Sequence, residues 1–332
     1  MKQPVAMVEV WRGAFREVIH KGHAVICDAD GQIVQSWGDP NLVFLPRSAV
    51  KIIQALPMVE TGAADAFGLS DRQLSLACAS HISSDIHIQA VKDWLAMLGL
   101  SDNDLACGPQ EPRDIAVRDA LIRAEEPVCR CHNNCSGKHS GMLTLARHLG
   151  ADLDYVSPSN PVQKAILATF EDLTGAKTRG YGIDGCSAPN YAFSLKEIAR
   201  AMAYIAWAPE DGSPRERAAA RLRRAMAAHP EMVSGDGEAC TELMRAMGGK
   251  ITIKGGAEGS YTAILPEHGL GIAVKIMDGA QRAQQAAITA LLVHMGVLDP
   301  DHPAARRWMM PVQKNFAGLE TGVICPAPGF PA

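Results

Sequence analysis

The sequence predicts an α+β protein in which an antiparallel sheet packs with helices beside a helix-rich lobe. Two β-hairpin patterns stand near the two ends of the chain, and the segments between them have helical periodicity. Strands separated in sequence from a run of helices are typical of α+β layering, whereas a doubly wound parallel sheet would alternate the two. We therefore expect an α/β lobe from residues 1–45 and 249–332, and a helix-rich lobe from residues 46–248.

Each hairpin pattern has two short apolar runs around a turn that contains glycine. In the first, residues 22–27 and 32–37 flank Asp28-Ala29-Asp30-Gly31, and in the second, residues 261–265 and 272–276 flank Pro266-Glu267-His268-Gly269. Glycine favours such turns because it adopts positive φ without a steric penalty. Apolar residues at three-to-four spacing predict the helices, over residues 86–98, 141–149, 161–173, 195–207, 215–228 and 280–295.

Composition indicates a globular protein and disfavours several classes of function. The 332 residues are 47% hydrophobic and 20% charged, with a net charge of −4. The densest basic stretch, Arg215 to Arg224, alternates with alanine and leucine, so we expect a solvated helix face and no nucleic-acid partner. No uninterrupted apolar segment has the ~20 residues that a membrane span needs. Nine cysteines without a signal-peptide pattern favour the reducing cytoplasm.

A Ser-x-x-Lys motif is the first chemical signal. Ser48 and Lys51 lie in the stretch FLPRSAVKIIQ, where Ser48 is a good helix-start residue. Residues three apart on a helix share a face, so the Lys51 amine could reach the Ser48 hydroxyl. A neutral lysine amine can take the proton of a serine nucleophile, and penicillin-recognising enzymes use this motif. Taken alone, the motif is explained better by an N-cap serine beside a solvated lysine, so the catalytic interpretation needs support from other segments.

Two further segments could complete such a site. The apolar run LSLACASH ends at Ser80 and His81, as if a buried segment delivered them to a loop, although a helix-capping cluster has the same pattern. A short strand, Ile251 to Lys254, leads into the glycines Gly255 and Gly256. Glycines there allow backbone N–H groups to approach a ligand closely. The strand-borne lysine followed by glycine is similar to that of serine β-lactamase-like enzymes.

The segment VCRCHNNCSGKHSGML carries the densest chemistry. Cys129, Cys131, His132, Cys135 and His139 fall within eleven residues, and Cys186 lies in a distant glycine-rich turn. Thiolates and imidazoles bind Zn²⁺, and catalytic zinc commonly keeps three protein ligands. The spacing leaves open a zinc site, a set of free thiols, or a catalytic Cys-His pair. A closed zinc finger is disfavoured because no second closely spaced pair occurs.

Taken together, the chain resembles the rhizobial-type (class 3) L-asparaginases, the L-asparaginase II family. The resemblance rests on RSAVK around Ser48, CASH around Ser80, NCSGKH around Cys135, DGC around Cys186, and HPEMVSGDG with Cys240 before Lys254. It implies a fold related to serine β-lactamases and glutaminases, a single catalytic unit over residues 1–332, and a homodimer. It also implies hydrolysis of L-asparagine to L-aspartate and ammonia.

The resemblance assigns roles to individual residues. It implies two Ser-Lys tandems, Ser48 with Lys51 and Ser80 with Lys254. It implies a zinc ion on Cys135, Lys138 and Cys186, although spacing alone would not select Lys138 over His132 or His139. A lysine binds metal only as the neutral amine. The predicted substrate contacts are His139, Asp184, Arg47, Asn134 and Gly255. Asp184 could pair with the substrate ammonium, or serve as a turn residue.

The predicted mechanism is acyl transfer. Lys51 accepts the Ser48 proton, Ser48 attacks the side-chain amide, and water hydrolyses the ester, while Ser80 and Lys254 relay protons and zinc anchors the substrate. A glutaminase or another amidase could use the same machinery, because one methylene is worth only ~1–3 kcal/mol of discrimination. A non-catalytic zinc or amino-acid-binding protein is a third reading. Zinc-hydroxide hydrolysis is disfavoured because the deaminase motifs are absent.

Overall fold

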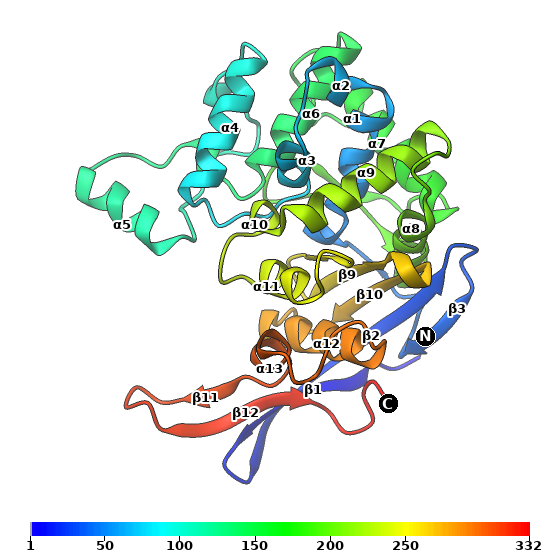
Figure 1. The fold of residues 1–332 in the computed structure, drawn as a ribbon, viewed down its shortest axis with the longest axis vertical. Coiled ribbons are helices and arrows are strands. Elements are labelled where there is room, and N and C mark those ends of the chain that lie inside the picture. The colour runs from blue at the N-terminus through cyan, green and yellow to red at the C-terminus, as the bar shows by residue number, and fades with distance from the viewer. Residues whose placement is uncertain (1) are drawn as a thin grey trace. The chain divides into compact units, whose positions relative to one another are not determined.

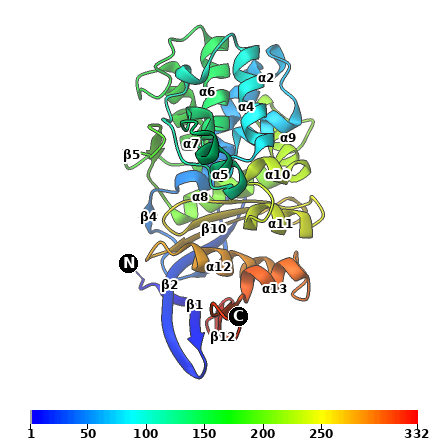
Figure 2. The same cartoon turned by 90° about the vertical axis from the view of Figure 1, so that its left-hand side faces the viewer.

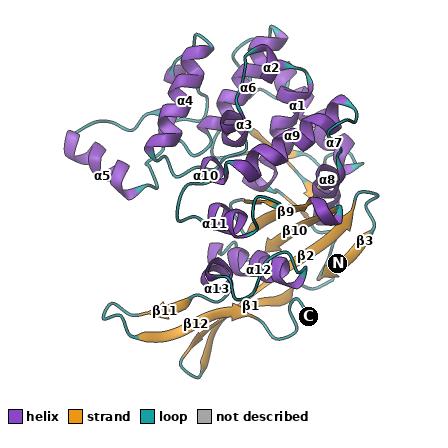
Figure 3. Cartoon of the chain, viewed as in Figure 1, coloured by secondary structure: helices purple, strands orange, loops and turns teal. Residues whose placement is uncertain are grey.

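The computed structural model describes residues 2–332, which form two compact units. Within the described residues, the first comprises 2–49, 193–207 and 242–332, and the second comprises 50–192 and 208–241. Figure 3 shows the strands gathered in the first unit and the helices dominating the second. The α+β class predicted from sequence is therefore confirmed. Within residues 2–332, no helix is both long and apolar enough to cross a bilayer.

The first unit is built on a mostly antiparallel sheet of eight strands within the described residues. Its order is β11-β12-β1-β2-β10-β9-β8, with β3 paired to β2 (Figure 1). The bounds are β1 (Val5–Arg12), β2 (Phe15–Asp28), β3 (Ile33–Trp37), β8 (Thr252–Gly255), β9 (Ser260–Leu265), β10 (Leu270–Ile276), β11 (Val312–Lys314) and β12 (Glu320–Pro326). Both predicted hairpins, β2–β3 and β9–β10, are confirmed.

Helices cover both faces of this sheet. Helix α8 (Leu195–Trp207) packs on β2, β9 and β10, and α12 (Gln281–His294) packs on β1, β9, β10 and β12. Figure 2 shows the two helices on opposite sides of the sheet. The unit is completed by β4 (Val43–Phe44) paired with β7 (Phe193–Ser194), η4 (Pro266–His268) and α13 (Pro303–Met309). Helix α11 (Ala239–Ala246) begins in the second unit and ends in the first.

The position of α8 corrects the predicted lobe boundaries. Residues 193–207 were assigned to the helix-rich lobe, but they belong to the sheet unit. The helix approaches β10 very closely at Gly271, where an added Cβ would lie 2.2 Å from the Ala199 carbonyl oxygen and 2.3 Å from the Ala203 nitrogen. Periodicity identifies the apolar face of a helix but not the element that this face covers, so the sequence could not place α8.

The second unit is helical. Its elements are α1 (Lys51–Glu60), α2 (Ala63–Ala66), α3 (Asp71–Ala77), α4 (Asp85–Met97), η2 (Asp102–Asp104), α5 (Ile115–Ala124), η3 (Arg130–His132), α6 (Ser136–Leu149), α7 (Pro161–Thr174), α9 (Pro214–Ala228) and α10 (Pro230–Val233), with a small hairpin of β5 (Tyr181–Ile183) and β6 (Pro189–Tyr191). Helix α1 packs against α6, α7 and α9, and α3 packs against α6 and α9. The buried Trp94 Nε1 donates to Thr144 Oγ1 at 2.9 Å, which fixes α4 on α6.

Candidate functional site

The serine of the first motif does not start the α-helix as predicted. Ser48 lies within a 3₁₀ turn, η1 (Arg47–Val50), and α1 begins only at Lys51. Arg47 has φ 53, a left-handed conformation that is uncommon for a residue with a Cβ. Pro46 cannot donate a backbone hydrogen bond, and its carbonyl accepts from Ala49 N at 3.2 Å. The chain therefore turns sharply just before the half-buried Ser48.

The predicted glycine-rich loop holds this turn within the first unit. Ser260 Oγ donates to Pro46 O at 2.8 Å, and Thr262 Oγ1 donates to Ala49 O at 2.7 Å. A Cβ added at Gly256 would lie 2.8 Å from Pro46 O and 2.9 Å from Ala49 N. Glycine is required there because the two backbones touch. The structure thus brings the loop after Lys254 against the residues on either side of Ser48.

Lys254 and Gly255 form the end of β8, one residue from the predicted bounds. Lys254 is buried, with 3% of its surface exposed, and its Nζ donates to Gly255 O at 2.6 Å. Gly255 lies against the Tyr261 ring, 3.0 Å from where its Cβ would stand. A buried ammonium requires polar partners, and the carbonyl of Gly255 supplies one of them.

In the second unit, Lys51 lies at the centre of a buried cluster. Its side chain is 1% exposed, and Nζ lies 3.0 Å from Ser80 Oγ and 3.1 Å from Cys135 Sγ. The same amine also donates to the carbonyl oxygen of Ala79. The three partners fill the donor capacity of one ammonium group. The structure therefore brings Lys51 together with Ser80, which sequence reasoning had paired with Lys254.

Ser80 reaches this cluster because α3 ends before it, as predicted. The chain leaves the helix at Ala77, and Ser80 N donates to Val233 O at 2.9 Å. His81 N then donates to Asn134 O at 3.2 Å, so the loop runs beside the segment that carries Cys135. Arg113 Nη2 donates to Ser80 O at 2.8 Å. These bonds fix the backbone on both sides of the Ser80 hydroxyl.

Cys135, Lys138 and Cys186 also converge, from two separate elements. Lys138 lies in the first turn of α6, directly after Cys135, and Cys186 lies in the turn between β5 and β6. Lys138 Nζ donates to Cys186 Sγ at 3.0 Å. Asn134 Oδ1 lies 3.0 Å from Cys135 Sγ, and Gln110 Oε1 accepts from Asn134 N at 3.0 Å. All three predicted ligands are at most 5% exposed.

Contacts among Cys135, Lys138 and Cys186 shift the pKa of each of them. Hydrogen bonding to Cys186 and burial raise the pKa of Cys135, and the same contact lowers the pKa of Cys186. Burial alone would lower the pKa of Lys138, but the sulfurs of Cys186 and Cys135 raise it. The three groups therefore influence one another's pKa through direct contacts. A metal ion displaces the protons of such groups when it binds, and a tetrahedral zinc would set neighbouring N and S ligand atoms about 3.5 Å apart. The donor set fits zinc.

His139 and Tyr155 form the wall beside Cys186. Tyr155 OH accepts from Ala106 N at 2.7 Å and lies 2.8 Å from His139 Nδ1. The phenol proton is therefore free to point to Nδ1, which leaves the imidazole proton on Nε2. Burial lowers the pKa of His139 to about 4, while Cys186 opposes that shift. Nε2 makes no hydrogen bond of good geometry within residues 2–332. No motif in the sequence pointed to Tyr155.

Asp184 is a turn residue in the structure, one of the two roles that the sequence left open; its contact with a substrate ammonium stays a prediction. Its main chain forms the turn, with Asp184 N donating to Ala188 O at 2.9 Å and Ser187 N donating to Asp184 O at 2.9 Å. Its Oδ1 accepts from Gly185 N at 2.7 Å. The charge of Asp184 also raises the pKa of Lys138, by less than the two sulfurs do, whereas burial lowers that pKa. Asp184 is half-buried, so part of its carboxylate remains open to solvent.

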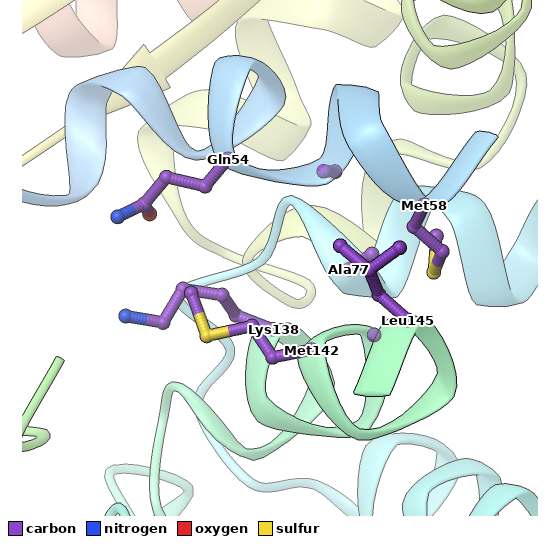
Figure 4. A pocket seen from close by; sticks show the side chains of 8 residues that line it. Gln54, Met58, Ala77, Lys138, Met142 and Leu145 are labelled. Atoms are coloured by element: carbon purple, nitrogen blue, oxygen red, sulfur yellow. The ribbon is translucent and has the colours of Figure 1, made fainter. Parts of the chain in front are cut away.

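A small cavity lies behind the cluster, between α1 and α6. Its volume is about 10 Å³, and its lining includes Gln54, Met58, Lys138 and Leu145. Figure 4 shows Gln54 and Lys138 at one end and Met58 and Leu145 at the other. A cavity of this size holds at most about one water molecule. It cannot hold an amino acid, so any substrate must approach Lys138 from another side.

Comparison with known proteins identifies the family. The family model described as L-asparaginase II matches residues 8–326. Comparison with curated proteins found no match. Similar solved structures include Mglu in its native form (16% identity, 84% of this chain and 66% of that chain, TM-score 0.45), a putative β-lactamase from Bacteroides dorei (12%, 77% and 84%, 0.42) and a class C β-lactamase from Rhodobacter sphaeroides (15%, 82% and 94%, 0.42). The chain thus spans slightly less than two thirds of the native Mglu chain. Because the family model covers nearly the whole sequence, the chain belongs to the L-asparaginase II family.

Proposed function

We propose that the protein is an L-asparaginase, which hydrolyses L-asparagine to L-aspartate and ammonia. The observation that carries the proposal is the contact of the buried Lys51 amine with Ser80 Oγ and Cys135 Sγ, in a chain that belongs to this family. A buried lysine that touches a serine hydroxyl can exchange protons with it, which suits Ser80 as a proton relay beside the proposed nucleophile Ser48. An amidohydrolase needs a nucleophile with a base, because the amide carbon is a poor electrophile.

The proposed chemistry begins at Ser48. Its hydroxyl proton passes to the neutral amine of Lys51, three residues further along the continuous chain, and Oγ bonds to the side-chain amide carbon of the substrate. The C–N bond then breaks, and the leaving nitrogen takes up the proton to depart as ammonia. Water attacks the resulting ester and releases aspartate, which restores the Ser48 hydroxyl. The buried position of Lys51 and its 3.0 Å contact with Ser80 Oγ support a role in proton transfer.

Ser80 is proposed to relay protons at Lys51. The 3.0 Å contact between Lys51 Nζ and Ser80 Oγ supports a direct transfer between the two groups. The pairing of Ser80 with Lys254 stays a prediction. The bonds from Arg113 and to Val233 support a Ser80 backbone that stays fixed during the transfer.

We also propose a zinc ion on Cys135, Lys138 and Cys186. When bound, it supplies a positive charge that anchors the substrate and the site. Among the substrate contacts, His139 Nε2 is supported by its buried, unpaired N–H within the described chain, and Asp184 by its half-exposed carboxylate beside Lys138. Arg47, Asn134 and Gly255 stay predictions. A homodimer is also proposed, to be tested by light scattering.

Ammonia release from L-asparagine, compared with L-glutamine and a β-lactam, tests the proposed activity. We expect turnover with L-asparagine, and loss of it in Ser48→Ala, in a variant whose zinc content and circular dichroism match the parent. Rapid denaturation during turnover, followed by peptide mass spectrometry, should place an aspartyl ester on Ser48. An ester on Ser80, or near-normal turnover by Ser48→Ala, would exchange the roles of the two serines. If the protein hydrolyses L-glutamine but not L-asparagine, its function is that of a glutaminase and the asparaginase proposal is wrong.

A further inference from the structure

Three metal-binding side chains gather outside the cluster described above. One ligand atom each from Asp102, Cys129 and Cys131 lies within 4.8 Å of the other two. Asp102 opens η2, and Cys129 and Cys131 stand immediately before and within η3, which packs against η2. These thiols belong to the dense cysteine segment of the sequence, but the proposed catalytic chemistry makes no use of them.

The backbone holds the three side chains in place. Asp102 Oδ1 accepts from Cys131 N at 2.6 Å, and Oδ2 accepts from Arg130 N at 3.1 Å. His132 Nδ1 accepts from Cys129 N at 2.8 Å, which closes the turn on its other side. Each carboxylate oxygen has a second lone pair, so Asp102 keeps the capacity to bind a cation. A pre-formed arrangement of this kind reduces the ordering cost of binding.

The donor set selects a thiophilic divalent cation. Two thiolates with one carboxylate suit zinc, whereas magnesium and calcium prefer oxygen ligands alone. Tetrahedral zinc separates its sulfur and oxygen ligands by about 3.5–3.8 Å, so the three atoms would have to move by about 1 Å or less. Two thiol protons would be released on binding. The site would then carry one net negative charge, on the same turn as the Arg130 guanidinium.

The Arg130 side chain adds two bonds at the same junction. Its Nη1 donates to the carbonyl oxygens of Asn103 and Leu105, at 2.7 and 2.8 Å. The same bonds tie η3 to the loop around η2, which is the junction that the three ligands also span.

We propose that Asp102, Cys129 and Cys131 form a second metal site, for zinc or a similar thiophilic cation, with water in the fourth position. The site clips η2 to η3 and so fixes the segment that leads to Cys135. Asp102 and Cys129 are half-buried, so this metal should exchange with solvent more readily than one on the buried Cys135 group. The proposal rests on its own ligands and does not require the asparaginase activity.

Metal content of the full-length protein tests the site. After saturation with zinc and desalting, we expect two equivalents in the parent and one in Cys129→Ser and in Asp102→Asn. Cys325→Ser is the matched control, because Cys325 is a half-buried thiol of β12, and it should keep two. Cobalt-loaded Cys129→Ser should lose part of the thiolate charge-transfer absorption of the parent. Circular dichroism confirms that each variant is folded.

The outcomes separate this site from the first one. If Cys129→Ser and Asp102→Asn bind as much metal as the parent, the second site does not exist. The same holds if Cys135→Ser removes all the metal, or if mass and thiol titration show a Cys129–Cys131 disulfide in place of nine free thiols. If Cys135→Ser binds as much metal as the parent while Cys129→Ser binds less, the second site exists and the first does not. Absence of asparaginase activity changes none of these results.

Discussion

Two pairs of cysteines, Cys135 with Cys186 and Cys129 with Cys131, have different charged neighbours. Cys135 and Cys186 are buried, and the amines of Lys51 and Lys138 touch them at 3.1 and 3.0 Å. Cys129 and Cys131, only a few residues earlier, lie instead beside the carboxylate of Asp102. The first pair thus contacts two lysine amines, and the second lies beside one carboxylate.

This difference decides what each pair can do. Ammonium groups next to buried thiols compete with a metal for the same lone pairs, so metal binding at Cys135 and Cys186 must be coupled to proton release from lysine. At Asp102 the competing groups are the thiol protons alone. We therefore expect the buried group to be coupled to acid–base chemistry and substrate, and the half-exposed group to act on local structure. Substitutions of Lys51, Cys186 and Cys131 test that division, and substitutions of Tyr155 and His81 test smaller effects nearby.

The largest effect is expected for Lys51→Ala. Removal of a general base typically costs about 10²–10⁴ in rate, and here it also removes the cation that contacts Cys135 and Ser80. Ammonia release from L-asparagine measures it, with zinc content as a check on the site. The matched control is Lys177→Ala, an exposed lysine of the same unit that pairs with Glu171, and it should leave turnover unchanged. Equal loss in both variants would place the chemistry elsewhere.

Cys186→Ser should cost one equivalent of zinc and raise KM for L-asparagine by at least about tenfold, since even outer contacts of a metal site are worth 10–100-fold. A larger effect on KM than on kcat would indicate that the metal binds the substrate rather than driving the chemical step. Cys131→Ser sharpens the comparison, because it should change metal content while kcat stays near that of the parent. If its kcat falls as far as that of Cys186→Ser, the two pairs act as one unit.

Tyr155→Phe should have a smaller effect, about tenfold on kcat/KM. The phenol holds the His139 tautomer through Nδ1, so its loss frees the imidazole to take the other tautomer and leaves Ala106 N–H without its acceptor. Titration of His139 by NMR should show the change in the Tyr155→Phe variant, whereas a purely structural role would lower stability and leave the tautomer unchanged. Tyr181→Phe, an exposed tyrosine of β5, is the control.

The smallest effect concerns acid stability. His81 is fully buried; burial and the stacked His87 ring lower its pKa well below 6.5. Its Nδ1 accepts from Ser83 N at 3.2 Å, so protonation there would break that bond. Because the unfolded chain binds the proton near pH 6.5, stability is complete above that pH and is lost below it, by up to about 1.4 kcal/mol per pH unit.

Urea unfolding between pH 8 and pH 5 measures this loss. His81→Gln should reduce the slope of unfolding free energy against pH, even if its stability at pH 8 is lower. The exposed His268→Gln should keep the slope of the parent. An unchanged slope in His81→Gln would assign the acid sensitivity to other buried groups.

Local patterns were sufficient for the elements with a strong turn or a clear period. The β2–β3 and β9–β10 hairpins and the helices α4, α7, α9 and α12 lie within a few residues of their predicted bounds. Strand β1 and the β11–β12 pair were not predicted, because they alternate weakly and their partners are far away in sequence. Strand β1, for example, pairs with β12, more than 300 residues later. The α-helical start assigned to Ser48 was wrong because η1 intervenes.

The sequence by itself determined the residue types of the site, through motifs whose order along the chain carries the family resemblance. It also determined the class of fold, since hairpin turns and helical periods are local properties. The tertiary structure alone decided that Lys51 lies beside Ser80 and Cys135, that Tyr155 supports His139, and that Cys129 and Cys131 meet Asp102 rather than Cys186. Such contacts depend on the packing of α1, α3, α6 and the intervening loops. The spacing of residues along the chain does not determine which charged side chain lies next to which thiol.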